Sequence, residues 1–326
     1  MKGIRCVLPL IVAMTTATVS CGGDDDSGSS TVTATGPTTV PASASVPAST
    51  VAPSSSTAPT TTLPTTTPVT AAPGTTGPAT PAAPTTSEPV DTMVLSAYFV
   101  RDEHVALVHR TVPHTVATTR AALEQLLEGP NPDEVALGMS SAVPAGTTLL
   151  GASIDGGVAT IDLSGSFGSG GGSLSMQLRL AQLVYTATQF PTVDEVVLEL
   201  DGQPVTVFGS EGIVLDQPLA RTDYENETPA ILVETPAPFD RVGPQLHATG
   251  TANVFEATFV VRVVDADGTV VYEHFQMATS GTGTRGTFDF TVDVAAAAHG
   301  PGLLRLWEPS SKDGSDTNVV EIPIEM

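Results

Sequence analysis

Between residues 91 and 223, the spacing of hydrophobic positions switches repeatedly between that of strands and that of helices. Runs rich in apolar and β-branched residues are paired around short turns, and stretches with apolar residues three or four apart end at glycine or proline. The expected strands are residues 93–100, 104–112, 147–154, 158–163, 195–200 and 204–208, and the expected helices are residues 115–128 and 173–189. This order, ββαββαββ, predicts an α+β domain with two helices packed on one face of a mixed or antiparallel sheet.

From residue 228 to residue 326 the pattern is that of short strands alone, with turn residues at regular intervals. The expected strands are residues 231–234, 245–250, 255–264, 269–277, 286–292, 302–308 and 318–324. About seven strands over roughly 100 residues fit an immunoglobulin-like β-sandwich. Because no disulfide is available, we expect large aromatic side chains to fill its core. The candidates are Phe255, Phe259, Phe288 and Trp307.

The N-terminus has the layout of a secretory signal peptide. A basic start precedes an apolar stretch, residues 7–13, and small residues lead to Cys21. That stretch is shorter than the roughly 20 residues a helix needs to span a bilayer, which favours cleavage over a transmembrane helix. We therefore expect residues 1–20 to be a lipoprotein signal peptide, with Cys21 lipid-modified and the mature protein anchored on the extracytoplasmic face of the cell membrane. The alternative is ordinary cleavage near Ser20, which would release a secreted protein with one free thiol.

Residues 21–90 consist almost entirely of Thr, Pro, Ala, Ser, Gly and Val, without an aromatic residue. Such a composition cannot bury enough apolar surface to offset the entropy of ordering the backbone, so we expect a disordered stalk. Its reach would run from about 45 Å as a flexible coil to about 210 Å fully extended. The Thr and Pro content is also typical of O-glycosylated stalks.

The remaining residues, 91–326, carry 10 basic and 31 acidic side chains, a net formal charge of −21. Binding to nucleic acid requires a basic patch that neutralises phosphates, so nucleic acid is not an expected partner. The acidity favours solubility and a partner with a basic surface.

Several short motifs in residues 91–326 resemble those of a known pair of domains. The first region resembles the GerMN domain in Tyr98-Phe99, Leu126-Leu127-Glu128-Gly129-Pro130, Ser141-Ala142-Val143-Pro144-Ala145-Gly146-Thr147 and the stretch from Gln182 to Phe190. The second region resembles the immunoglobulin-like domain of bacterial spore-germination proteins in the stretches 250–258 and 310–315. The resemblance implies an assembly or binding module rather than an enzyme. It does not by itself imply sporulation, because similar domains occur in envelope lipoproteins of bacteria that form no endospores.

The motifs of nucleotide and metal sites are incomplete in this chain. The glycine-rich loop 165–172 lies between an expected strand and an expected helix but has neither the spacing nor the Lys-Ser/Thr ending of a phosphate loop. His104, His109 and His114 are five residues apart, without a carboxylate or cysteine at ligand spacing. Turn aspartates could gather around calcium, although they do not match an EF-hand; these are Asp265, Asp267, Asp313 and Asp316. We therefore name no catalytic residue, cofactor or metal ligand.

Glu256 and Glu308 are the remaining candidates, because each lies beside an aromatic residue in an expected strand. They could mark a partner surface, but the structural interpretation, in which their neighbours belong to the core, is favoured. The sequence thus predicts a lipid-anchored, non-enzymatic protein that binds another envelope component near the membrane. The alternative is a protein that binds or modifies peptidoglycan.

Overall fold

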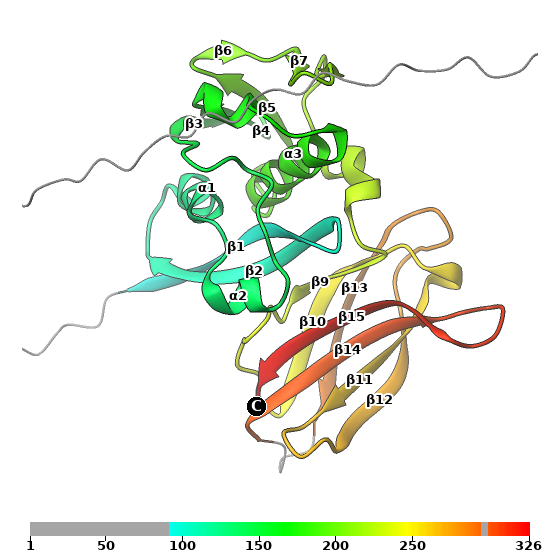
Figure 1. The fold of residues 1–326 in the computed structure, drawn as a ribbon. Helices are drawn as coiled ribbons and strands as arrows, with labels where there is room; N and C mark the ends of the chain where they lie inside the picture. The colour runs from blue at the N-terminus through cyan, green and yellow to red at the C-terminus, as the bar shows by residue number, and fades with distance from the viewer. Residues whose placement is uncertain (1–90, 295–298) are drawn as a thin grey trace, which may run out of the picture. The chain divides into compact units, whose positions relative to one another are not determined.

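The computed structural model describes residues 91–294 and 299–326 (Figure 1). The expected signal peptide, Cys21 and the expected stalk lie outside the described residues. Within them, a mixed α/β region is followed by an all-β region, as the sequence predicts. No helix in the described part of the chain is long and apolar enough to cross a membrane.

A β-hairpin opens the first domain. Strand β1 (Thr92–Arg101) pairs antiparallel with β2 (His104–Pro113) along their whole length. The two-residue turn Asp102-Glu103 has φ values of 52° and 62°. These left-handed values match the twist of the flanking strands in a tight hairpin, so the predicted hairpin is confirmed.

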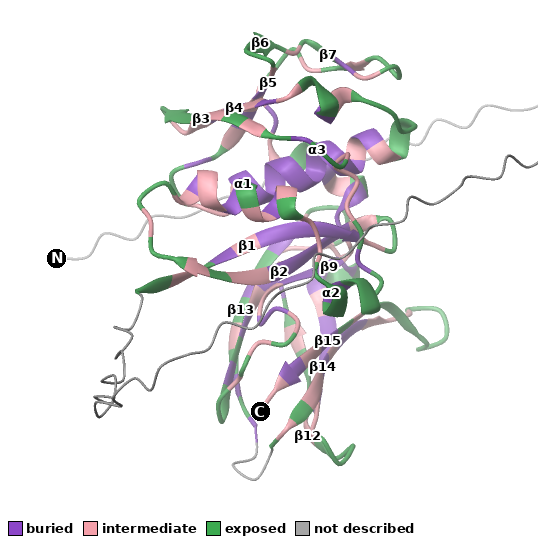
Figure 2. Ribbon diagram, turned by 60° about the vertical axis from the view of Figure 1, so that its left-hand side comes forward, coloured by how far each residue is buried: buried purple, intermediate pink, exposed green. Residues whose placement is uncertain are grey.

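Helices α1 (Thr118–Glu128) and α3 (Ser173–Ala187) lie between this hairpin and a second sheet (Figures 1 and 2). In the second sheet β3 and β4 are antiparallel, β4 and β5 are parallel, and β5 and β6 are antiparallel. The two expected helices correspond to α1 and α3, which contact sheets on two sides rather than one, and the short helix α2 was not expected. The elements are α1 (Thr118–Glu128), α2 (Pro132–Ala136), β3 (Leu149–Asp155), β4 (Val158–Leu163), the 3-10 turn η1 (Gly165–Gly168), α3 (Ser173–Ala187), β5 (Glu195–Leu200), β6 (Gln203–Pro204), β7 (Val207–Phe208) and β8 (Ile213–Val214).

Side chains of α3 and of Gln189, just after its end, cover the outer edge of β1. The Gln189 side chain accepts from the Ser96 amide and donates to its carbonyl, both at 2.7 Å. Thr186 accepts from the Tyr98 amide at 3.2 Å, and Gln182 donates to the Tyr98 carbonyl at 2.9 Å. An unpaired strand edge exposes polar backbone groups, and here buried polar side chains of a helix satisfy them. This explains why polar residues recur on the buried face of α3.

The second domain is a sandwich of two antiparallel sheets, reached through the 3-10 segment η2 (Arg221–Glu227). One sheet has the order β13-β10-β9 and the other β12-β11-β14-β15. The seven predicted strands are confirmed, with small shifts at their ends. They are β9 (Ile231–Thr235), β10 (Gln245–Ala252), β11 (Thr258–Val264), β12 (Val270–Met277), β13 (Gly286–Asp293), β14 (Pro301–Pro309) and β15 (Asp316–Glu325).

Two of the four expected core aromatics are placed differently. Phe259 and Phe288 lie between the sheets with ring centroids 5.1 Å apart, as predicted. The expectation for Phe255 is wrong: it is 51% exposed, because the 3-10 turn η3 (Phe255–Ala257) precedes β11 and turns it outward. Trp307 is buried, but on the opposite face of β14 from the core residues Leu304 and Leu306. There it packs against the guanidinium groups of Arg262 and Arg305, at 5.0 and 5.1 Å.

The hairpin β1–β2 is buried on both faces. One face packs on α1 and α3, and β2 contacts strand β9 of the second domain. Leu232 of β9 and Ala237 just after it belong to the same buried cluster as Tyr98, Phe99 and Leu107 of the hairpin. The two domains therefore share part of one hydrophobic core.

Candidate functional site

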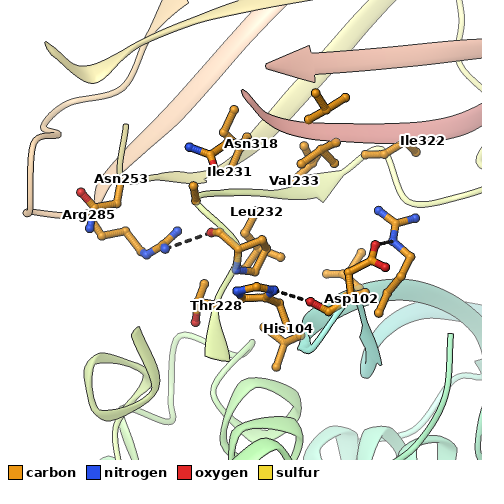
Figure 3. Close-up of a pocket in the computed structure, with 18 of the residues that line it drawn as sticks. Asp102, His104, Thr228, Ile231, Leu232, Val233, Asn253, Arg285, Asn318 and Ile322 are labelled. Carbon is orange, nitrogen blue, oxygen red and sulfur yellow. Dashed lines mark hydrogen bonds and ion pairs between the residues drawn. The ribbon is translucent and has the colours of Figure 1, made fainter. Parts of the chain in front are cut away.

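A cleft of about 460 Å³ lies at the junction of the two domains (Figure 3). Its walls are the turn of the β1–β2 hairpin (residues 101–107), the chain entering β9 (residues 228–233) and β15 (residues 318–322). We call it the interdomain cleft. Its volume is in the range of sites that bind small molecules or short peptide segments.

At one end of the cleft, Arg285 is held by the segment that joins the domains. Its guanidinium pairs with both carboxylate oxygens of Glu225, at 2.8 and 3.0 Å, and donates to the Pro229 carbonyl at 3.0 Å. Asn253 donates to the same carboxylate at 2.7 Å. Burial opposes ionisation of Glu225, yet the hydrogen bonds from Arg285 and Asn253 outweigh it, so the pKa of this carboxyl is lower than usual. Arg285, Glu225 and Asn253 therefore bind one another and stabilise the segment that connects the two domains.

At the floor of the cleft, the hairpin turn orients His104. Its Nδ1 lies 2.6 Å from the carbonyl oxygen of Asp102, an interaction visible in Figure 3. Nearby, burial raises the pKa of the Glu227 carboxyl, an effect only partly offset by a backbone hydrogen bond and by His104. His104 is therefore oriented by the backbone of its own turn rather than by another side chain.

Beside the cleft, a partly buried polar network crosses the junction. The Tyr98 hydroxyl donates to Glu234 at 2.7 Å, and Arg221 donates to the same carboxylate oxygen at 2.7 Å. The Arg221 guanidinium also lies 4.6 Å from the ring centre of Tyr185, whose hydroxyl is 2.6 Å from that of Thr228. Burial raises the pKa of Tyr98 well above its usual value, so the phenol stays protonated and donates. A further cross-domain contact joins His109 Nδ1 to Asp240 Oδ2 at 2.7 Å.

The three histidines singled out from the sequence do not meet. His104 contacts its own turn, His109 contacts Asp240, and the backbone amide of His114 donates to the Asp91 carbonyl. Among the described residues no group of His, Cys, Asp and Glu is arranged to hold a metal ion. The histidine spacing therefore reflects strand and turn positions.

The four turn aspartates also stay apart. Asp265 accepts from the amides of Asp267 and Thr269, which stabilises the turn between β11 and β12. Asp313 accepts from Ser315, and Asp316 pairs with Arg305. The turn interpretation, rather than calcium binding, describes their geometry.

The glycine-rich loop is bound to a cation of its own chain. Arg179 donates to the carbonyl oxygens of Phe167, Ser169 and Gly170, and also to that of Ala142. The loop thus turns three carbonyls toward a buried guanidinium, which is the opposite of the amide cradle of a phosphate site. The sequence favours a flexible connector over an anion site, whereas the structure shows a loop whose carbonyls are held by Arg179.

Glu308 has a structural role at the end of the sandwich. Its carboxylate accepts from the Phe255 amide at 2.8 Å and from the Asn318 side chain at 2.6 Å. Glu256, with φ of 53°, lies in the turn η3. These contacts tie a turn to the β14–β15 hairpin.

Sequence reasoning missed the residues that build the junction, above all Tyr98, Arg221, Glu225, Glu234 and Arg285. They come from segments far apart in the chain, so no local motif joins them. One signal was available: residues 97–100 and 105–108, on either side of the first turn, are continuously apolar, which is typical of strands buried on both faces.

The comparisons with known proteins agree with this architecture. Residues 96–206 match the Germane family model, described as sporulation and spore germination, and residues 230–315 match Gmad2, an immunoglobulin-like domain of bacterial spore germination. No curated protein sequence matched the chain.

Three solved structures are similar to this chain. The first GerMN domain of the sporulation protein GerM from Bacillus subtilis is 27% identical, with 40% of this chain and 100% of that chain covered and a TM-score of 0.34. The tandem GerMN domains of the same protein are 20% identical, with 62% of each chain covered and a TM-score of 0.36. A putative lipoprotein from Clostridium perfringens is 22% identical, with 44% of this chain and 98% of that chain covered and a TM-score of 0.31. The chain thus contains a region that matches the Germane model, residues 96–206, followed by a region that matches the immunoglobulin-like domain of bacterial spore germination, residues 230–315.

Proposed function

We propose that this chain is a lipid-anchored envelope protein whose two domains act together as one non-enzymatic binding module. The observation that carries the proposal is the interdomain cleft, whose walls come from both domains. A shared hydrophobic core and the Tyr98–Glu234–Arg221 network hold those walls in place. A preformed cavity between rigidly joined elements is suited to recognising a partner without rearrangement.

The polar groups around the cleft support binding rather than catalysis. Arg285 and Glu225 satisfy each other, and His104 is held against the carbonyl of its own turn. A catalytic pair needs a nucleophile or acid within reach of a base and directed at a substrate. Here the side chains with suitable chemistry are engaged in holding the two domains together.

The anchor would act by raising local concentration. A lipid on Cys21 would confine the module to the extracytoplasmic face of the membrane, and the segment 21–90 would let it reach components at a distance. Tethering of this kind turns a weak encounter into an effectively intramolecular one. The mechanism therefore needs no chemical step in the folded domains.

The anchor is tested by metabolic labelling with an alkyne-bearing fatty acid. We expect the intact chain to take up the label and to sediment with membranes, and Cys21→Ala to lose both properties. Label retained after Cys21→Ala would show that the lipid is not on this residue. Absence of label from the unaltered chain would show that there is no lipid anchor.

The binding function is tested by crosslinking in cells that make the intact chain, followed by affinity purification and mass spectrometry. We expect a small set of envelope proteins enriched with the unaltered chain and reduced with Cys21→Ala. Recovery of peptidoglycan fragments alone would contradict a protein-binding module and favour a wall-binding protein. Hydrolysis of purified wall by the chain would contradict the non-enzymatic assignment.

A further inference from the structure

The outer edge of β15 already pairs with an extended segment at its C-terminal end. The amides of Phe239 and Val242 donate to the carbonyls of Pro323 and Glu325, each at 2.7 Å, and the Glu325 amide donates to Asp240 at 2.9 Å. This loop after β9 therefore forms a short parallel addition to the sheet. The C-terminal end of this edge is therefore already paired, by residues 239–242.

The addition stops just before the interdomain cleft. Peptide groups along an edge strand face outward at every second residue, so Glu321 is the next outward-facing position after Pro323. The Glu321 carbonyl has a long contact of 3.5 Å from Arg101. Among the described residues, no backbone hydrogen bond is formed at this outer position. The contrast is with β1, whose outer edge is covered by side chains of α3 and of Gln189.

The open position lies between two hollows. On the inner side is the interdomain cleft, to which Val320 and Ile322 contribute. On the other side is a hollow of about 510 Å³, to which Leu303, Glu321 and Pro323 contribute. Side chains of a strand point alternately to opposite faces, so a strand added here would place successive side chains in the two hollows.

We propose that the edge of β15 at Glu321 binds an extended, basic peptide segment of a protein partner. The charge preference follows from the turn that borders both hollows: Arg101 lies 4.0 Å from Asp102, but the Asp102 side chain is 93% exposed and Glu103 beside it is also exposed, so the two acids outnumber the one cation. The surrounding described domains are strongly acidic, with 31 acidic against 10 basic residues over 91–326. Backbone pairing supplies the orientation, and the acidic turn selects Lys or Arg. The inference rests on the proposed binding function and names the chemistry of the partner.

The test uses fluorescence anisotropy with the intact chain and two pools of short synthetic peptides. Both pools alternate Val, Thr and Tyr with a charged residue, which is Lys or Arg in the first pool and Glu in the second. We expect binding of the basic pool, weakened by salt, and weaker binding of the acidic pool.

The backbone contact is isolated by comparing two variants of one residue. Glu321→Pro removes the outward amide without removing a bond to β14, and Glu321→Ala removes the same carboxylate but keeps the amide. We expect Glu321→Pro to bind the basic pool about tenfold more weakly than Glu321→Ala, which corresponds to one lost hydrogen bond in a desolvated site. Equal affinities for the two variants would overturn the proposal.

A second pair of variants does not depend on a proline in the sheet. Asp102→Asn with Glu103→Asn removes the acidic turn but keeps residues that tolerate its left-handed backbone. The charge-matched control is Asp155→Asn with Asp267→Asn, two exposed positions elsewhere, at the end of β3 and in the turn after β11. We expect the first pair to weaken binding of the basic pool about threefold or more relative to the control. Equal binding by the two pairs, or no binding of the basic pool to the unaltered chain, would overturn the proposal.

Failure of the β15 edge proposal can be distinguished from failure of the proposed binding function. If crosslinking in cells captures the same envelope proteins with the unaltered chain and with Glu321→Pro, the chain is a binding module but this edge is not its site. If crosslinking captures no protein, the proposed function itself fails.

Discussion

Tyr98 of β1 and Glu234 of β9 lie in different domains, yet the Tyr98 hydroxyl donates a hydrogen bond of 2.7 Å to the Glu234 carboxylate. Tyr98 is 1% exposed, and Arg221, from the segment between the domains, binds the same carboxylate oxygen. The contact therefore joins the first hairpin, the connecting segment and the sandwich in one partly buried network. A bond in this position affects how the domains unfold as well as how stable they are.

We expect Tyr98→Phe to lower the free energy of unfolding by about 1 kcal/mol, because the partly buried Glu234 carboxylate loses one donor while Arg221 still pairs with it. The measurement is urea denaturation of the intact chain followed by circular dichroism. The matched control is Tyr272→Phe, which alters a hydroxyl that accepts from Gln276 within β12, away from the junction. Equal losses in the free energy of unfolding would show that the cross-domain hydrogen bond contributes no more to stability than the one within β12.

Much of the fold follows from the sequence because its signals are local. Turn residues between β-branched runs predict the hairpins, and the helical spacing that ends at Gly129 predicts α1. The short helix α2 was missed although its signal is present: Asn131 and Glu134 form a capping box around Pro132. It was overlooked because a five-residue helix is too short to show a hydrophobic period.

The junction could not be predicted in the same way. Glu225 and Arg285 are 60 residues apart and become neighbours only when β13 is placed in the sandwich. Trp307 shows a related limit, since hydrophobicity correctly predicts its burial but not its position beneath Arg262 and Arg305. Which face of a strand is covered by arginine side chains depends on tertiary neighbours, not on the strand itself.

The two acids of the connecting segment should respond to pH in opposite directions. The pKa of Glu225 is lowered in the folded state, so its contribution to stability is present above its usual pKa and is lost as pH falls through the lower, folded value. The pKa of Glu227 is raised by burial, so its ionised form opposes folding, and stability is lost as pH rises through the folded value.

We therefore expect Glu225→Gln to lower the free energy of unfolding at neutral pH and to flatten its decline in acid. Glu227→Gln should raise the free energy of unfolding at neutral pH. Urea denaturation at a series of pH values measures both effects. Destabilisation by Glu227→Gln at neutral pH would show that its carboxylate has a favourable partner in the folded state.

The different positions of Phe255 and Phe259 give a direct test of the corrected core. Phe259 is fully buried, so Phe259→Ala should cost about 3–5 kcal/mol through lost burial and a cavity. Phe255 is 51% exposed, so Phe255→Ala should cost about 1 kcal/mol or less. Denaturant midpoints of the two variants make the comparison. Equal losses of stability in the two variants would indicate that the Phe255 side chain is part of the buried core.

Arg179 gives the last test, because one buried side chain holds the glycine-rich loop. It is 2% exposed and donates to four carbonyl groups, three of them in residues 167–170. Arg179→Met keeps the length of the side chain but leaves these carbonyls without their donor, so we expect a loss of at least about 3 kcal/mol and faster proteolysis of the loop. The control is Arg120→Met, which removes an exposed pair with Glu124 on α1 and should cost less than about 0.5 kcal/mol. Urea denaturation and limited proteolysis measure the two effects. A loop that stays resistant in Arg179→Met would show that its backbone, rather than the guanidinium, sets its conformation.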